Sequence, residues 1–191
     1  MTLKSIQFIL FTWKHIVNNE LFRLDFPMTE SVSLDIEKLV SDKIEKGVVG
    51  SSLCLENRKL GDEGISKLSS LEILSEIVCL ELGENNISDA GLKILCNSPY
   101  IQRLKTLNLK SNNITELGAK SIAESPKLAK LEHLILKFNR VGEIGATYLA
   151  ESETLTNLST LDLFRNRIGD KGAQIIKKSK NFRGVSRMRL D

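Results

Sequence analysis

The chain has 191 residues and a formal net charge of +3, so its size indicates one or two domains and its charge gives no general reason to expect nucleic acid. Hydrophobic residues make up 41 % of it, which argues against general disorder, and no apolar run reaches the length of a membrane span. Thirty leucines against seven Phe, two Tyr and one Trp predict many similar small packing layers.

Residues 1–49 are predicted to form a helical cap over the rest of the chain. Residues 3–24 place several apolar side chains on one broad helical face, and residues 34–44 fit an amphipathic helix that ends at Gly47. An alternative is that the first helix binds a partner or a membrane surface, although its polar face holds few basic residues. A cleaved signal peptide is a further alternative, against which the short apolar run 6–13 and the polar residues behind it argue.

From residue 50 onward the same residue types return every 27 positions without insertion or deletion. The main columns are Leu53, Leu80, Leu107, Leu134, Leu161 and Met188; Leu55, Leu82, Leu109, Leu136, Leu163 and Leu190; Gly64, Gly91, Gly118, Gly145 and Gly172; and Asn85, Asn112, Asn139 and Asn166. Such self-similarity is typical of stacked repeats. We therefore predict a repeat array over residues 50–191, with five full 27-residue repeats and the start of a sixth.

A representative unit is LKTLNLKSNNITELGAKSIAESPKLAK, residues 104–130. Its alternating leucines put Leu107 and Leu109 on the same side of a short strand. The unit resembles the leucine-rich repeat family, in particular the ribonuclease-inhibitor-like subclass, which has a helix in each repeat. The resemblance implies an α/β solenoid with a short curved parallel sheet on the concave face and helices on the convex face. It also implies that the Asn column forms a ladder of hydrogen bonds to neighbouring loop backbone.

An acidic residue begins each predicted helix, where negative charge suits the helix dipole. These residues are Asp62, Asp89, Glu116, Glu143 and Asp170. The Gly column follows inside the first helical turn. Because glycine is a poor helix former, we expect the helix to approach its strand closely there.

The last predicted strand, in the sequence VSRMRLD, has no capping helix behind it in this chain. We expect an open strand edge and apolar surface around Ile176 and Phe182, through which copies of the chain could self-associate. The alternative is that Arg187, Arg189 and Asp191 keep this edge polar.

In the resembled family, the concave strand surface and its flanking loops bind partners. The outward-facing positions predict a partner-binding surface made of Glu81, Glu84, Lys110, His133, Ile135, Lys137, Phe138, Asp162, Phe164, Arg165, Arg187 and Arg189. Its centre is expected at Ile135, Lys137, Phe138, Phe164 and Arg165, because aromatic residues beside basic ones are typical anchors of protein interfaces. The alternative is that both Phe side chains fold over the rim and pack locally.

Charge is divided unevenly along the array. Residues 1–100 hold ten basic and fifteen acidic side chains, a net −5, whereas residues 101–191 hold seventeen and nine, a net +8. Sequence order is spatial order in a repeat stack, so the sequence predicts a structure that is acidic at one end and basic at the other. Such a gradient suits an oriented partner or head-to-tail self-contact.

The sequence offers no pattern for catalysis, a metal or a cofactor. Cys54 and Cys79 fall on a diagonal of neighbouring strands, too long for a disulfide, so we expect thiols. Three cysteines without a secretion signal favour a reducing, cytoplasmic setting. His133 has no predicted Ser or Cys partner, and phosphate loops, dinucleotide fingerprints and zinc spacings are missing from the sequence.

We therefore expect a non-catalytic scaffold that binds another protein through its concave face. One alternative is a self-assembling module that uses its last strand. Another is a regulatory module acting on a GTPase, as the architecturally similar Ran GTPase-activating proteins do, although no matching catalytic residue can be assigned here. A third is a module that binds an anionic partner through its basic half; the low net charge argues against nucleic acid.

Overall fold

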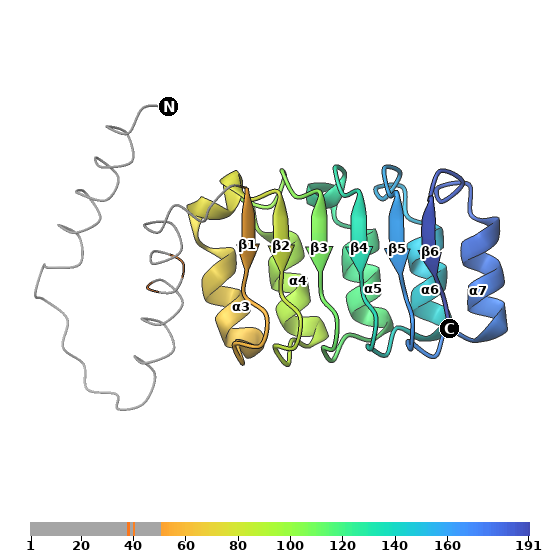
Figure 1. Ribbon diagram of the computed structural model, residues 1–191, viewed down its shortest axis with the longest axis horizontal. Coiled ribbons are helices and arrows are strands. Elements are labelled where there is room, and N and C mark those ends of the chain that lie inside the picture. Colours follow the sequence, from red (N-terminus) through yellow and green to blue (C-terminus); the bar gives the residue numbers. More distant parts are fainter. Residues whose placement is uncertain (1–37, 39, 41–50) are drawn as a thin grey trace, which may run out of the picture. The chain divides into compact units, whose positions relative to one another are not determined.

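The computed structural model describes residues 38, 40 and 51–191 (Figure 1). Strands and helices alternate along the last of these ranges. The strands are β1 (Ser52–Cys54), β2 (Cys79–Glu81), β3 (Thr106–Asn108), β4 (His133–Ile135), β5 (Thr160–Asp162) and β6 (Arg187–Arg189). The helices are α3 (Gly61–Ser69), α4 (Asp89–Asn97), α5 (Glu116–Ala123), α6 (Gly142–Ala150), α7 (Gly169–Lys178) and the short 3-10 helices η1 (Glu72–Glu76) and η2 (Pro126–Leu128). Apart from residues 38 and 40, the predicted cap 1–49 lies outside the described residues.

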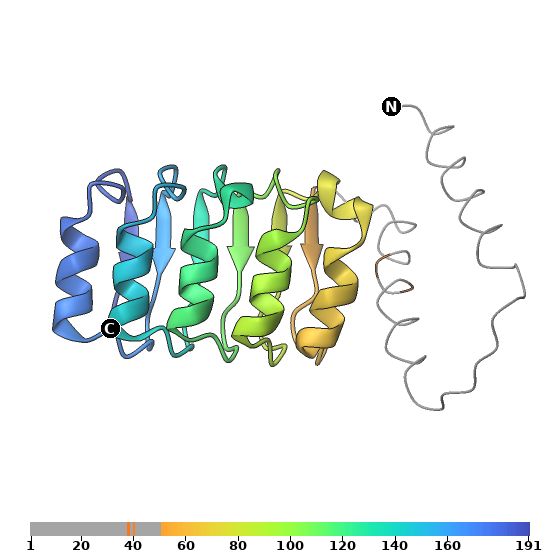
Figure 2. The ribbon, with the colours of Figure 1, turned by 180° about the vertical axis from the view of Figure 1, so that it is seen from behind.

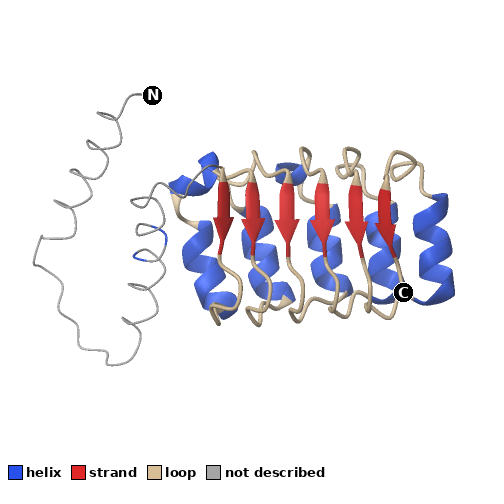
Figure 3. Cartoon of the chain, viewed as in Figure 1, coloured by secondary structure: helices blue, strands red, loops and turns tan. Residues whose placement is uncertain are grey.

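The strands form one parallel sheet in the order β1-β2-β3-β4-β5-β6. Leu53 pairs with Leu80 and Leu80 pairs with Leu107, and this register of 27 residues continues to the last strand pair. Figure 3 shows the strands in one layer, and Figure 2, seen from behind, shows the helices covering the other face of the sheet. The predicted α/β solenoid is therefore confirmed. We call the uncovered side of the sheet the strand face.

The core lies between the two layers and repeats along the array. Leu80, Leu107, Leu134 and Leu161 from the strands are all 0 % exposed, as are Leu92, Ile122 and Leu149 from the helices. Each layer has the same small set of aliphatic side chains, so a single repeat exposes apolar faces that only its neighbours can cover. Val40 is buried in the same hydrophobic cluster.

The Asn column hydrogen-bonds neighbouring repeats together at the lower edge of Figure 1, where each strand passes into a turn. Asn112 Nδ2 donates to the carbonyl oxygens of Leu82 and Leu109, both at 3.0 Å. Its Oδ1 accepts from the backbone N–H groups of Asn85 and Ile87. Buried backbone groups must be paired, and these amides satisfy them where the strand ladder has ended.

A second ladder, which the sequence analysis missed, runs along the opposite edge. Ser98, Ser125, Ser152 and Ser179 are spaced 27 residues apart and are all buried. Each hydroxyl donates to the last carbonyl groups of the preceding repeat's helix, as Ser125 Oγ does to Cys96 at 2.7 Å. The 27-residue spacing of these serines was visible in the sequence and could have revealed them.

The prediction that each Gly brings its helix close to a strand is wrong, because the close neighbour is the preceding helix. A Cβ on Gly91 of α4 would clash with Asp62 Oδ1 and lie 3.1 Å from Asp62 Cα, in α3. A Cβ on Gly145 of α6 would lie 3.0 Å from the Cα of Glu116 in α5. Glycine therefore lets the first turns of adjacent helices pack side by side.

The predicted apolar surface around Ile176 and Phe182 is also wrong. Ile176 is 0 % exposed and Phe182 is 4 % exposed, because both belong to the buried cluster of the array. At the same end, the Asp191 carboxylate accepts hydrogen bonds from the backbone N–H groups of Asn166 at 2.8 Å and Ile168 at 2.6 Å. It satisfies the same kind of backbone donors that Asn112 satisfies three repeats earlier.

Candidate functional site

The early part of the strand face is a closed network of charges. Asn108 Nδ2 donates to Glu81 at 2.5 Å and to Glu56 at 3.2 Å. Lys110 Nζ lies 3.2 Å from Glu56 and 3.6 Å from Glu84. The hydrogen bond with Glu56 raises the pKa of Lys110 above its ordinary value, with both carboxylates adding attraction. The carboxylates have local partners, but three carboxylates against one ammonium group leave this part of the strand face with a net negative charge.

The middle of the strand face holds His133, and here the structure corrects the sequence analysis. His133 Nδ1 lies 3.0 Å from Thr160 Oγ1 and 3.3 Å from Ser159 Oγ, a hydroxyl that the sequence did not place there. The Ser159 hydroxyl also lies 3.1 Å from the backbone oxygen of Glu132, to which it donates. A serine that donates to a backbone carbonyl is not held by the imidazole as a nucleophile would be.

The cysteines differ in exposure. Cys54 is exposed, Cys79 is half-buried and Cys96 is buried. Burial raises the pKa of the Cys79 thiol, and it raises the pKa of Cys96 to about 12. Cys96 is thus a packing residue in α4.

The later part of the strand face carries a compact aromatic and basic group, which we call the Phe–Arg cluster: Phe138, Phe164, Arg165 and Arg189. The two rings meet edge to face, with centroids 5.9 Å apart and planes at 79°. Arg165 Cζ lies 5.6 Å from the centroid of each ring, and Arg189 Cζ lies 4.6 Å from that of Phe164. Cation–π attraction of this kind restrains the guanidinium groups at a solvent-exposed site.

Phe138 has a backbone conformation that is unfavourable for its side chain. Its φ is +60°, and the residue is 43 % exposed. Left-handed backbone costs a non-glycine residue about 1–2 kcal/mol, and a bulky side chain is a rare occupant. The equivalent positions, also left-handed, hold Asn57, Glu84, Ser111 and Arg165. A large apolar ring is therefore displayed to solvent at a position suited to small or polar side chains.

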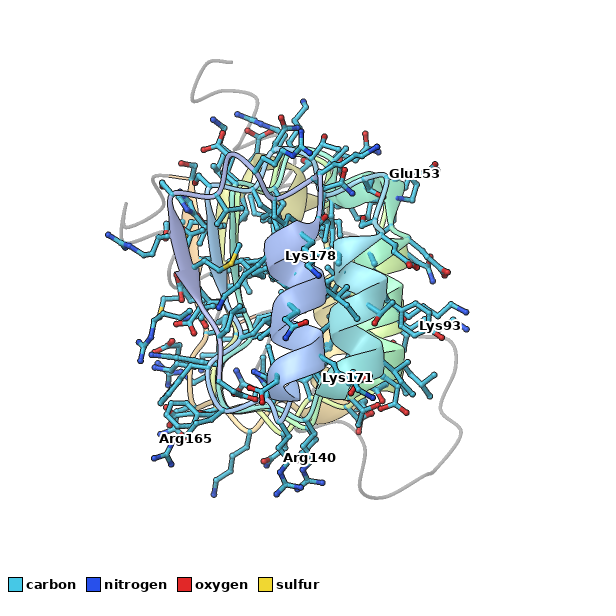
Figure 4. All side chains as sticks on the ribbon, turned by 90° about the vertical axis from the view of Figure 1, so that its right-hand side faces the viewer. Lys93, Arg140, Glu153, Arg165, Lys171 and Lys178 are labelled. Atoms are coloured by element: carbon cyan, nitrogen blue, oxygen red, sulfur yellow. The ribbon has the colours of Figure 1, made fainter. Side chains whose placement is uncertain are left out.

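The cluster borders a shallow depression of about 600 Å³, which we call the arginine depression. It is lined chiefly by Phe138, Arg140, Phe164, Arg165, Arg167 and Asp191. Figure 4 shows Arg140 and Arg165 projecting from the lower edge of the array. Arg140, Arg165 and Arg167 are exposed, and among residues 51–191 none of them is in an ion pair.

The predicted site residues therefore divide into separate groups. Glu81, Glu84 and Lys110 lie in the early network, whereas the Phe–Arg cluster lies at the ends of β4 and β5 and on β6. Asp162 of β5 is used locally: it accepts from the Phe164 N–H at 3.1 Å and lies 3.9 Å from Arg189. Ile135 and Lys137 are half-buried, and Arg187 is exposed on β6.

Arg140 and Arg167 were not among the predicted site residues, although they are 27 residues apart in one column. That column follows the Asn ladder by one residue and was not read as part of the strand face. The signal was available, because basic residues occupy it in two successive repeats.

The described residues hold no group of three or more His, Cys, Asp or Glu side chains arranged to bind a metal ion. No helix in this part of the chain is long and apolar enough to cross a membrane.

Residues 77–96, 102–123, 127–150 and 154–176 match the family model described as Leucine Rich repeat. A comparison with curated proteins finds no match. Among solved structures, the chain is similar to an internalin (inlF) from Listeria monocytogenes, with 29 % sequence identity and a TM-score of 0.48, over 66 % of this chain and 31 % of that chain. The chain thus spans less than a third of that internalin's length. With four matched repeats and a parallel sheet that gains one strand per repeat, the described array is a leucine-rich repeat solenoid.

Proposed function

We propose that this protein is a non-catalytic scaffold that binds another protein through the later part of its strand face. Leucine-rich repeat proteins generally act as protein-interaction scaffolds, which supports the class of function. The observation that carries the proposal is Phe138, a large apolar residue that is 43 % exposed on left-handed backbone. The equivalent turn is left-handed in the other repeats too, so what distinguishes Phe138 is its large apolar ring, which the buried core does not use.

The surroundings of Phe138 also resemble a binding surface. Interface hot spots are enriched in aromatic residues and Arg, and the Phe–Arg cluster offers two rings and two guanidinium groups within one small area. Its edge-to-face pair and cation–π contacts fix these side chains before a partner arrives. Little side-chain freedom is therefore lost on binding.

The experiment compares wild-type protein with a Phe138→Ser, Phe164→Ala double variant as bait in an extract of the native source. Serine is chosen because Ser111 occupies the equivalent left-handed position. The matched control is Leu117→Ala, Ile144→Ala, which removes two side chains that are 59 % and 60 % exposed on the helix layer. We expect at least one protein to be lost from the double variant and retained by the control. Identical sets of bound proteins on all three baits would contradict the proposal.

Two finer statements belong to the same proposal. The helix in each full repeat and the 27-residue step support assignment to the ribonuclease-inhibitor-like subclass. The half-buried Cys79 and buried Cys96 are thiols, which supports a reducing, cytoplasmic setting.

Self-association through β6 stays a prediction, which the open strand edge now supports without the apolar surface that was expected beside it. β6 is an edge strand of the described sheet, but Ile176 and Phe182 are buried and add no apolar surface beside it. Arg187 and Arg189 are exposed, and repulsion between like charges opposes the pairing of two such edges. Sedimentation velocity over a wide concentration range tests the prediction, because a constant monomer would exclude self-association.

A further inference from the structure

We propose that the arginine depression binds an acidic segment of a partner protein that contains both carboxylate and apolar side chains. This inference rests on the proposed function and specifies the chemistry of the partner. It concerns Arg140 and Arg167 at the lower edge as well as the Phe–Arg cluster.

The depression carries an excess of positive charge, because three guanidinium groups and one carboxylate, that of Asp191, line it. Arg140, Arg165 and Arg167 line it together, all are exposed, and none is in an ion pair within residues 51–191. The carboxylate in its wall belongs to Asp191, whose two oxygens accept backbone N–H groups of Asn166 and Ile168. Guanidinium groups that are in no ion pair favour carboxylates, with which they form charge-assisted and often bidentate hydrogen bonds.

The same depression also offers apolar contact beside the charge. The rings of Phe138 and Phe164 line it, and Arg165 lies 5.6 Å from both centroids. A ligand carboxylate that reaches Arg165 therefore brings its neighbouring residue against a ring. A segment that contains both acidic and apolar side chains satisfies both kinds of contact, because its carboxylates can pair with the guanidinium groups while an apolar side chain packs against a ring.

A peptide fits this surface better than a nucleic acid does. Neighbouring strands lie about 4.8 Å apart, so the depression, formed by the turns after β4 and β5, spans only a short length of the array. A longer polyanion that followed the strand face toward β1 would meet the carboxylates of Glu56, Glu81 and Glu84. These acidic groups limit the attractive region to a site for a few residues.

The probe is a fluorescein-labelled peptide in which Asp and Glu alternate with Leu and Phe, titrated with the full chain and followed by fluorescence anisotropy. A peptide with Asn and Gln in place of the acids tests the role of charge, and a single-stranded oligonucleotide of equal charge tests the nucleic-acid alternative. The variant is Arg140→Glu, Arg165→Glu, Arg167→Glu. Its matched control is Lys171→Glu, Lys177→Glu, Lys178→Glu on α7, which changes the net charge equally at three exposed positions (Figure 4 labels two of them).

We expect the acidic peptide to bind wild type saturably and the arginine variant at least about tenfold more weakly, with less than about a threefold change in the lysine control. Binding should weaken as salt is raised, because exposed charges are screened. Should the triple variant fail to fold, Arg165→Gln alone is expected to weaken binding, and Glu84 in the equivalent left-handed position shows that a polar side chain is tolerated there.

Equal losses in both triple variants, equal binding of the uncharged peptide, tighter binding of the oligonucleotide, or no saturable binding to wild type would each overturn the inference. The proposed function fails separately. A captured partner that depends on Phe138 and Phe164 but not on the three arginines would contradict the acidic-segment inference and leave the scaffold function standing.

Discussion

The Asp89 carboxylate accepts two hydrogen bonds from Thr115 of the following repeat, from its N–H at 2.8 Å and from its Oγ1 at 2.5 Å. It also accepts the Gly118 N–H at 2.9 Å. Asp62 and Ser88 are joined in the same way one repeat earlier. An acidic residue that the sequence assigned to a helix dipole therefore ties its helix to the start of the next one.

This hydrogen bond between an Asp and the hydroxyl that caps the next helix is replaced in the later repeats. Glu116 and Glu143 replace Asp, and the hydroxyl positions become Gly142 and Gly169, with φ of +66° and +65°. Their helices begin without a side-chain cap. The cap residue and the acidic residue of the preceding repeat thus change together: Ser88 and Thr115 face Asp, whereas Gly142 and Gly169 follow repeats with Glu.

Asp89→Ala is expected to lower the free energy of unfolding by about 1–3 kcal/mol, because it leaves the Thr115 and Gly118 N–H groups without their acceptor. Glu116→Ala is the matched control in the column where no side-chain cap follows, and it should change stability by less than about 0.5 kcal/mol. Urea unfolding followed by circular dichroism measures both. Equal losses of unfolding free energy would mean that negative charge at the helix start, and not the hydrogen bond between repeats, stabilises the array.

Gly91→Ala is expected to lower the free energy of unfolding by about 1–3 kcal/mol, the usual cost of overpacking, although alanine is the better helix former. Its Cβ would clash with Asp62 Oδ1 and lie 3.1 Å from the Asp62 backbone. Gly184→Ala is the control, since a Cβ there meets nothing within 4 Å. Thermal unfolding of both variants checks the expectation, which a Gly91→Ala variant as stable as wild type would contradict.

Asn112→Ala is expected to lower the free energy of unfolding by at least about 2 kcal/mol. The backbone N–H groups of Asn85 and Ile87 would lose their acceptor and remain buried. Its neighbour Asn113 is exposed, so Asn113→Ala should be nearly neutral. Chemical denaturation distinguishes the two. A similar loss in both variants would show that the ladder contributes no more than an ordinary surface amide.

Cys96 is expected to resist alkylation by iodoacetamide at pH 8 in the folded protein. Burial raises its pKa to about 12, so the reactive thiolate is populated in roughly one molecule in ten thousand at that pH, and access is blocked as well. Mass spectrometry should find exposed Cys54 modified first, and Cys96 modified only when denaturant is added. Rapid modification of Cys96 without denaturant would mean that α4 opens readily.

Much of the fold could be predicted because it depends on spacing. The columns that include Leu53 and Leu55 pointed to strands and an inner face, and the 27-residue step reappears as strand register. The Gly column was misinterpreted because sequence shows that a close neighbour is needed but not which element supplies it. Ile176 and Phe182 were expected at the surface because their burial depends on how α7 and the following turn fold back onto the core.

The sequence predicted some residues of the candidate site but not all of them. Phe138, Phe164 and Arg165 were identified as apolar and basic residues where solvent is expected, yet Arg140 and Arg167 were missed. Glu81 and Glu84 were grouped with these residues from their columns, and the sequence did not show that Lys110 and Asn108 would contact their carboxylates locally.

The sequence by itself determined the layers of this protein, because a leucine that recurs every 27 residues has one place in a stack and one direction to point. Tertiary structure alone decided which exposed side chains lie together. Phe138, Arg165 and Arg167 belong to turns with positive φ, and that backbone geometry aims side chains from different columns and repeats into one depression. A period specifies position along the array, but convergence at the surface depends on turn dihedrals and side-chain contacts between repeats.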